Sequence, residues 1–203
     1  MATRIGVLAL QGAFSEHVTS LEQAGAETAE IRLPSGLGTI DGLVIPGGES
    51  TSISLLMSEY RMFDPICELA RQGFPIWGTC AGLIMLSSLS SHFYPRTLGV
   101  MDVKVERNAY GRQLDSFEAD LEIPALGVQP YRGIFIRAPK IAGVGPDVQV
   151  LCRQPGNVPV AVRQGNLLSC SFHPELSGDI RFHRYFLEIV RGRQIARTGN
   201  TCQ

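Results

Sequence analysis

The first half of the chain alternates short apolar runs with helix-like patterns. Residues 5–10 form an unbroken apolar run, which is typical of a strand buried on both faces. Phe14, Val18 and Leu21 then recur at helical spacing, so residues 14–24 are expected to form a helix. The alternation continues with expected strands over residues 29–33, 42–45 and 74–77 and helices over residues 50–58, 62–71 and 80–89. This order predicts a parallel sheet with helices on both faces.

The second half of the chain has a different period. Apolar and charged residues alternate strictly within residues 102–106 and 117–123, which indicates antiparallel strands with one wet face. Further strands are predicted over residues 134–136, 148–151, 158–162 and 167–172, and a final helix over residues 179–190. The polar tail, residues 191–203, is expected to be frayed. Residues 1–203 are therefore expected to form a single α/β domain with a mixed, mostly parallel sheet.

Composition excludes several classes of function. The 203 residues carry 18 basic and 19 acidic side chains, mixed along the chain, for a net charge of −1. Without a basic run, nucleic acid and anionic membranes are not expected as partners. No apolar stretch approaches the roughly 20 residues of a membrane span, and the short apolar start is not a signal peptide. Five widely spaced cysteines without a CxxC motif predict free thiols in the cytoplasm, and no metal or other cofactor.

A Gly-Thr-Cys-Ala-Gly segment at residues 78–82 joins the strand at 74–77 to an apolar helix. This pattern predicts a nucleophile elbow with Cys80 at its tip, because the sharp, strained turn tolerates only small neighbours such as Gly78, Ala81 and Gly82. The positive end of the following helix favours a thiolate at Cys80. The N–H of Ala81 can donate to an oxyanion. The alternative is a buried structural cysteine at a tight turn.

A His-Pro-Glu segment at residues 173–175 supplies a candidate base. Thiol-based acyl transfer needs a group that takes a proton and returns it to the leaving group, and His173 suits this role. Residues two apart in an extended segment face the same side, so Glu175 can orient the His173 ring. A surface turn is the alternative for this segment taken alone. Structural or solvent-facing roles are expected for the other histidines, which are His17, His92 and His183.

A third segment, Pro-Gly-Gly-Glu-Ser-Thr at residues 46–51, completes the predicted pocket. The N–H groups of Gly47 and Gly48 can face an anion without interference from side chains, so this loop is expected to complete an oxyanion hole with Ala81. Ser50 or Thr51 is expected to cap the next helix. An ordinary strand-to-helix turn is the alternative. A phosphate loop is disfavoured because no Gly-Lys-Ser/Thr follows.

Together these segments resemble the class I glutamine amidotransferases, which use a Cys-His-Glu triad. More narrowly, the chain resembles the glutaminase subunits of pyridoxal 5′-phosphate synthase over roughly residues 4–190. The motifs that carry this resemblance stand in family order at residues 10–12, 46–51, 78–82, 106–108, 111–118, 135–139 and 171–176. The resemblance implies a three-layer, flavodoxin-like fold, with Cys80 as nucleophile, His173 as base and Glu175 as its orienter.

The resemblance also implies a substrate, L-glutamine, which would be hydrolysed to L-glutamate and ammonia. The family's glutamine-binding positions correspond to Gly48, Glu49, Ser50, Arg107, Ile136 and Arg137 in this sequence. Part of this agrees with simple chemistry, since an arginine can hold the α-carboxylate of glutamine and a carboxylate can hold its α-ammonium group.

The ammonia needs a consumer, because free ammonia would be protonated and diffuse away. The family resemblance names this partner as the synthase subunit that builds pyridoxal 5′-phosphate, in a large hetero-oligomer. It also implies that the glutaminase is poorly active until docked. Gln11, near the end of the first predicted strand, is a candidate relay at that interface, with a solvated turn residue as the alternative.

Three competing interpretations remain at the level of sequence. The chain can serve another synthase, such as imidazole glycerol phosphate synthase, although the segments at residues 78–82 and 115–118 disfavour this. It can be a non-catalytic interaction module on the same scaffold, although the complete set of Cys80, His173 and Glu175 disfavours that. The related proteases, chaperones and glyoxalases with a cysteine elbow fit poorly with a His-Pro-Glu segment near the C-terminus.

Overall fold

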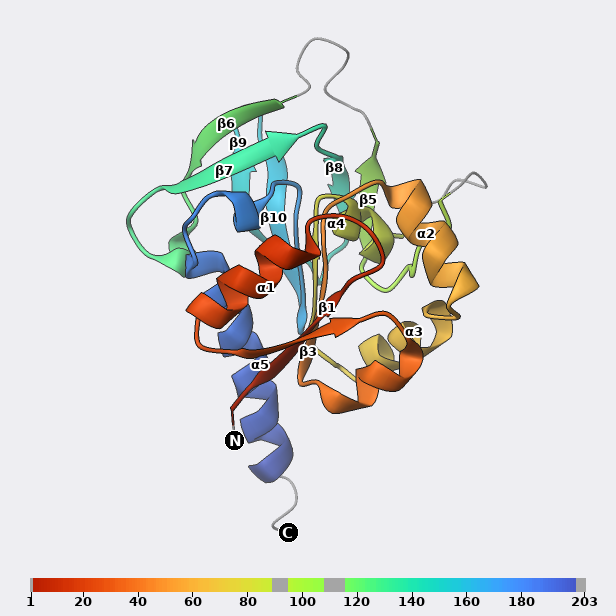
Figure 1. Cartoon of the computed structure of the whole chain (residues 1–203). Coiled ribbons are helices and arrows are strands. Elements are labelled where there is room, and N and C mark those ends of the chain that lie inside the picture. The colour runs from red at the N-terminus through yellow and green to blue at the C-terminus, as the bar shows by residue number, and fades with distance from the viewer. Residues whose placement is uncertain (1, 89–94, 108–115, 200–203) are drawn as a thin grey trace.

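A seven-stranded mixed sheet runs through the centre of the molecule (Figure 1). The computed structural model describes residues 2–88, 95–107 and 116–199. The sheet has the order β2-β1-β3-β4-β11-β10-β9 and consists of β1 (Arg4–Leu8), β2 (Glu27–Ile31), β3 (Gly42–Ile45), β4 (Ile76–Thr79), β9 (Gln149–Gln154), β10 (Val158–Gln164) and β11 (Leu167–Cys170). Pairing is parallel from β2 to β11 and antiparallel for β10 and β9. The predicted mixed, mostly parallel sheet is confirmed.

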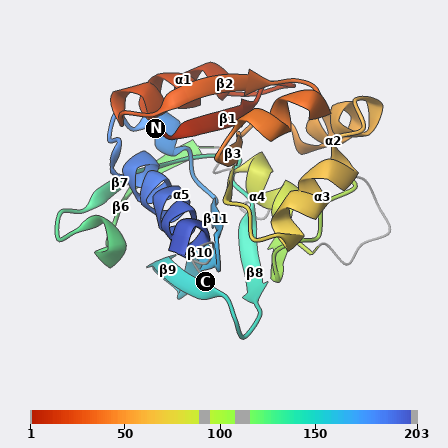
Figure 2. The same ribbon diagram turned by 90° about the horizontal axis from the view of Figure 1, so that it is seen from below.

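Helices cover both faces of this sheet, which gives three layers (Figure 2). The helices are α1 (Phe14–Gln23), α2 (Ser50–Glu59), α3 (Phe63–Arg71), α4 (Ala81–Leu86) and α5 (Arg181–Gly199). Helices α1 and α5 pack on one face with Trp77, and α2, α3 and α4 pack on the other with Ile76. Because side chains alternate along a strand, neighbours such as Ile76 and Trp77 enter opposite cores. This is why β3, β4 and β11 are buried at every position.

Two short antiparallel ribbons lie outside the main sheet. One pairs β5 (Val103–Glu106) with β8 (Lys140–Val144), and the other pairs β6 (Ser116–Leu121) with β7 (Tyr131–Ile136). Figure 1 shows the β6–β7 ribbon at the end of the molecule opposite the two termini. Three short 3₁₀ turns complete the fold: η1 (Pro34–Thr39), η2 (Pro124–Leu126) and η3 (Pro174–Leu176).

The structure corrects two expectations about the second half of the chain. Strand β8 is absent from the sequence prediction, because Gly143 interrupts its apolar pattern. Helix α5 continues to Gly199, so residues 191–199 are helical and not frayed as expected. Arg193 anchors this extension, because its guanidinium donates to the carbonyl of Gln72 at 3.2 Å and lies over the ring of Phe74.

Membrane-spanning helices and metal clusters are both absent from the described residues. None of the helices in residues 2–88, 95–107 and 116–199 is both long and apolar enough to cross a membrane. The same residues contain no group of three or more His, Cys, Asp or Glu side chains that could hold a metal ion.

Candidate active site

Cys80 stands at a strained turn between β4 and α4. Its backbone φ of 48° and ψ of −104° lie in a region that residues other than glycine rarely adopt. A Cβ added to Gly78 would lie 2.4 Å from the carbonyl oxygen of Gly82, and one added to Gly82 would lie 2.0 Å from that of Ile45. The glycines therefore permit the close approach of strand and helix that holds Cys80 in this conformation.

His173 faces Cys80, and Glu175 faces His173 from its other side. Nδ1 of His173 and Oε1 of Glu175 are 2.7 Å apart, and both residues are buried. Burial alone would lower the pKa of His173, but hydrogen bonds to Cys80 and Glu175 outweigh it and raise this pKa to about 10. These contacts therefore favour the protonated form of His173. The structure brings together the three residues that the motifs predicted.

Glu175 is the buried anchor of this group. Its side chain is 0% exposed and, besides His173, it faces Nε2 of His17 at 3.2 Å. Burial alone would raise the pKa of Glu175, but His17 and His173 outweigh it and hold this pKa well below its usual range. Glu175 is thus a carboxylate at every pH at which the protein is expected to work.

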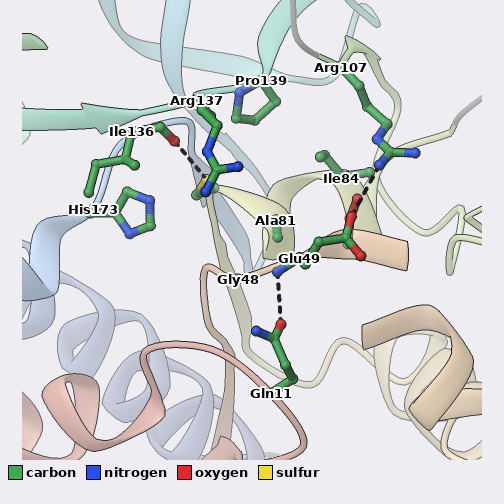
Figure 3. Close-up of a pocket in the computed structure, with 12 residues that line it drawn as sticks. Gln11, Gly48, Glu49, Ala81, Ile84, Arg107, Ile136, Arg137, Pro139 and His173 are labelled. Atoms are coloured by element: carbon green, nitrogen blue, oxygen red, sulfur yellow. Dashed lines mark hydrogen bonds and ion pairs between the residues drawn. The ribbon is translucent and has the colours of Figure 1, made fainter. Parts of the chain in front are cut away.

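A pocket of about 320 Å³ opens in front of Cys80 and His173 (Figure 3). It is lined by Gln11, Gly48, Glu49, Ser50, Cys80, Ala81, Ile84, Arg107, Ile136, Arg137, Pro139 and His173. All six predicted glutamine-binding residues are on this wall. Ile84 and Pro139 also line the pocket but were not predicted as site residues, because the sequence gives only indirect signals for them. Ile84 is one helical turn beyond Cys80, and Pro139 follows Arg137 by two residues.

The far wall of the pocket carries opposite charges. Nη2 of Arg107 lies 3.4 Å from Oε1 of Glu49 and 3.2 Å from Oγ1 of Thr51. The side chains of Arg107 and Glu49 are 33% and 52% exposed, so this ion pair is open to solvent. An exposed pair contributes only about 0–1 kcal/mol to stability, which leaves both charges available to a zwitterionic ligand.

Glu49 also corrects the expected helix cap. It, and not Ser50 or Thr51, is the N-cap of α2, since its extended backbone places Oε2 at 2.8 Å from the N–H of Ser52. Burial would raise the pKa of Glu49, but hydrogen bonds from Ser52 and Thr51 outweigh burial and lower it. The carboxylate is thereby fixed at the entrance of the pocket.

The glycine loop packs as closely as its sequence suggests. A Cβ on Gly47 would lie 2.5 Å from Cε1 of His173, and a Cβ on Gly48 would lie 2.4 Å from Oε1 of Gln11. Gly48 and Ala81 line the pocket, whereas Gly47 supports the His173 ring from behind. Oε1 of Gln11 accepts from the N–H of Glu49 at 2.8 Å, as Figure 3 shows. Gln11 is therefore a wall residue that also orders the loop.

The end of β7 also approaches Cys80. Figure 3 shows the carbonyl of Ile136 directed at the sulfur, and the two atoms are 3.9 Å apart. Arg137 follows with a φ of 42°, a second strained residue on the pocket wall. Backbone strain at both Cys80 and Arg137 indicates that the fold holds this pocket in shape.

Two further polar residues, His17 and His183, lie behind Glu175 and were expected to be structural or solvent-facing. A solvent-facing role is wrong for both, because each is 0% exposed. One sequence signal for His17 was available: it falls with Phe14, Val18 and Leu21 on one helical stripe. His92, like residues 108 and 111–115 of the motifs, lies outside the described residues.

The solved structures that the fold resembles include a glutamine amidotransferase, which defines the class of the protein together with the family match. One of them, described as a glutamine amidotransferase, superposes with a TM-score of 0.86 at 46% identity and covers 92% of this chain and 98% of its own. A putative GMP synthase protein from Thermoplasma acidophilum, with a TM-score of 0.70 at 15% identity and 98% of each chain covered, shares the fold alone.

The chain belongs to the SNO glutamine amidotransferase family, whose model matches residues 7–192. Among its relatives is the pyridoxal 5′-phosphate synthase subunit PdxT of Pelotomaculum thermopropionicum, 51% identical over 98% of this chain and 99% of that protein. The PdxT of Thermotoga maritima is 48% identical over 93% of this chain and 100% of that protein. The resemblance predicted from the motifs is confirmed, and the protein is an enzyme of the glutamine amidotransferase class.

Proposed function

We propose that this chain is the glutaminase subunit of a pyridoxal 5′-phosphate synthase, and that it hydrolyses L-glutamine at Cys80. The observation that carries the proposal is the contiguous arrangement of Cys80, His173 and buried Glu175 at the floor of a pocket with opposite charges at its entrance. The near full-length similarity to proteins named as PdxT subunits supports the identity of the synthase.

The first half of the reaction forms a thioester. The thiolate of Cys80 attacks the side-chain amide carbon of glutamine, and the carbonyl oxygen becomes an oxyanion beside the N–H groups of Ala81 and Gly48. His173 then gives its proton to the amide nitrogen. The C–N bond breaks, ammonia leaves, and a γ-glutamyl thioester remains on Cys80.

The second half restores the enzyme with one water molecule. His173, now neutral, takes a proton from this water, and the resulting hydroxide attacks the thioester. The C–S bond breaks, the Cys80 thiolate is regenerated, and glutamate leaves. Glu175 accepts from Nδ1 of His173 throughout, which keeps Nε2 directed at the reacting atoms.

The charges at the pocket entrance account for substrate choice. Arg107 can pair with the α-carboxylate of glutamine, and Glu49 with its α-ammonium group, in exchange for their contact with each other. Ser50, Ile136 and Arg137 complete this binding wall. The amide end of the substrate then reaches Cys80.

The ammonia passes to the synthase subunit. Ammonia released to bulk water would be protonated, so a docked consumer is needed, and we assign the assembly to a large hetero-oligomer. Gln11, which lines the pocket and fixes the loop at Glu49, is the proposed relay to the partner. We also propose that residues 1–203 form one glutaminase domain that works in the cytoplasm, because the described cysteines are free thiols.

The test is glutaminase activity of this chain, alone and mixed with the synthase subunit. We expect activity that rises with the synthase and is lost in Cys80→Ala. The matched control is Cys67→Ala, because Cys67 is a half-buried thiol on α3 outside the pocket, and this variant should retain activity. Hydrolysis by Cys80→Ala at the wild-type rate would exclude the mechanism. Full activity without any synthase would remove the argument for docking.

A further inference from the structure

Behind the pocket, a second set of polar side chains is buried around the carboxylate of Glu175. Oε1 of Glu175 faces His173, and Oε2 faces Nε2 of His17 on α1 at 3.2 Å. Among the described residues, Oε2 has no well-aligned hydrogen bond, and its ion-pair contact is with His17. The same Nε2 is 3.1 Å from Oγ1 of Thr79, the residue that precedes Cys80.

The other edge of the His17 ring meets a third histidine. Nδ1 of His17 is 3.1 Å from Nε2 of His183 on α5, and both side chains are fully buried. Trp77 holds the two imidazoles in place, with ring centroids 5.4 Å from His17 and 4.9 Å from His183, both edge-on. Within the described part of the chain, Nδ1 of His183 has no hydrogen-bond partner.

These contacts determine where the protons lie. If Nε2 of His17 lacked a proton, its lone pair would face a buried carboxylate oxygen at 3.2 Å. Nε2 therefore carries the proton, which it donates to Oγ1 of Thr79 while facing Oε2 of Glu175. If Nδ1 of His17 also carried a proton, His183 would accept it at Nε2 and its own Nδ1–H would be a buried donor without a partner. Orphaned donors are rarer than orphaned acceptors, so both histidines are neutral with the proton on Nε2.

We propose that His17 is a positioning residue for the amidotransferase reaction, with His183 fixing its tautomer. The N–H of His17 holds the outer oxygen of Glu175, so that the inner oxygen is aimed at Nδ1 of His173. This inference deepens the proposed function, because it concerns the same Cys80–His173–Glu175 site.

The arrangement joins the two halves of the site. Thr79 and Cys80 belong to the elbow, whereas His173 and Glu175 belong to the segment after β11, and His17 touches both sides. Without His17, the outer oxygen of Glu175 would lose the polar N–H group that faces it at 3.2 Å. The carboxylate would then turn away or take up a proton, and in either state it would stop orienting His173.

The other ionisable groups near this cluster come from several elements. Cys80 and Glu175 act on His173, and His17, Glu175 and Asp179 act on His183. Cys170 on β11 is also near Glu175 and is a neutral thiol, because burial raises its pKa. Of these groups, His17 is the one that faces the outer oxygen of Glu175, so its removal isolates that contact.

The first experiment compares two substitutions of His17 in the complete complex with the synthase. His17→Phe keeps an aromatic ring and removes the donor, whereas His17→Gln keeps an amide donor where Nε2 lies. We expect His17→Phe to lower kcat about 10- to 100-fold, with KM little changed. This range is the one typical for the loss of an outer group that orients a functional side chain, as measured at metal sites. His17→Gln should restore most of kcat.

The pH profile provides a readout that loss of packing alone would not change. In His17→Phe the carboxyl of Glu175 loses its donor, so we expect the acid limb of kcat to move to higher pH. His17→Gln should keep the wild-type position. The matched control is Leu21→Val, one turn further along the same buried face of α1, which should lower the unfolding temperature without moving the limb.

The second experiment reads the protons directly. Nitrogen-15 NMR of the histidine rings should show the proton of both His17 and His183 on Nε2, with no proton on Nδ1 of either ring. A proton on Nδ1 of either ring would overturn the inference. So would a His17→Phe variant with the kcat and pH profile of the wild type.

Failure of this inference is distinguishable from failure of the proposed function. If the wild-type complex hydrolyses glutamine and Cys80→Ala does not, the function stands whatever His17 does. If the wild-type complex shows no glutaminase activity, the proposed function fails, and with it the positioning role that depends on that reaction.

Discussion

The two histidines His173 and His183, on either side of Glu175, have pKa values that are shifted in opposite directions. On the pocket side, burial alone would lower the pKa of His173, but hydrogen bonds to Cys80 and Glu175 raise it to about 10. On the helix side, burial lowers the pKa of His183 to about 3. Burial removes charge from a histidine unless an anion accompanies it. The fold thereby makes one histidine ready to exchange protons and keeps the other neutral.

The same contrast holds for the ion pairs. Arg107 and Glu49 face the pocket and solvent, so the charged groups of a ligand can replace their contact with each other. Glu175 and His17 are enclosed, with side chains 0% exposed, and a substrate cannot take the place of either. The pocket side is therefore built to bind and release, and the buried side to hold one geometry. The following changes test that division, from the largest expected effect to the smallest.

Replacement of the buried carboxylate should have the largest effect. Glu175→Gln keeps the shape of the side chain but removes the charge that fixes the His173 ring, so we expect kcat to fall about 10³- to 10⁴-fold. Steady-state glutaminase assays with the synthase present would measure this fall. A variant within about tenfold of the wild type would show that Glu175 does not orient the base.

Removal of a pocket charge should affect binding and not chemistry. Arg107→Ala removes the proposed partner of the substrate α-carboxylate, and charge-assisted hydrogen bonds contribute about 1.5–3 kcal/mol. We therefore expect KM to rise about 10- to 100-fold while kcat changes little. Initial rates over a range of glutamine concentrations separate the two. A fall in kcat at unchanged KM would contradict the assignment of Arg107 to substrate binding.

His183 should make stability depend on pH. The pKa of His183 is lowered to about 3 in the folded protein. The unfolded chain therefore binds a proton at His183 below about pH 6.5, whereas the native protein binds it only below about pH 3. Stability is therefore present above pH 6.5 and is lost as pH falls, by about 1.4 kcal/mol per pH unit. Urea unfolding at pH 7 and pH 5 measures how much the free energy of unfolding falls between these two pH values. This fall should be about 2 kcal/mol larger in the wild type than in His183→Phe. Equal differences would show that His183 is not buried in the neutral form.

A surface ion pair gives the smallest expected effect and completes the comparison. Arg132 and Glu118 pair across the β6–β7 ribbon, with side chains 63% and 49% exposed. Exposed pairs contribute about 0–1 kcal/mol, so Arg132→Ala should change the free energy of unfolding by no more than that. Urea unfolding with and without added salt would measure it. A loss of several kcal/mol would mean that exposure does not separate strong from weak pairs in this protein.

Much of the fold was predictable because its central strands are buried on both faces. Unbroken apolar runs at β1, at β3 and in the strand before Cys80, with helical patterns between them, are typical of a parallel sheet covered on both sides. Strand β8 was missed because Gly143 weakens its pattern. The end of α5 was missed because its last turns are polar and are held by Arg193 against residues far away in the sequence.

The pocket was predictable because its chemistry lies in compact motifs. Cys80, His173 and Glu175 each have neighbours whose types point to one role, and Gly47 and Gly48 indicate a close approach. The buried side had no such motif. His17 and His183 are separated by 166 residues, and each taken alone resembles an ordinary histidine on a helix. Local pattern cannot show that two such residues meet.

By itself, the amino-acid sequence determined the class of fold and pointed to the proposed nucleophile, its proposed base and the carboxylate beside that base. These features depend on local spacing: alternation for strands, a glycine turn for the elbow, and the two-residue step from His173 to Glu175. Only the tertiary structure decided what stands behind Glu175. There α1, α5 and the elbow converge in a core without solvent, where each proton position depends on groups from distant parts of the chain. Such a network is a property of packing, because His17 and the residues that it contacts, Thr79, Glu175 and His183, are far apart in the sequence.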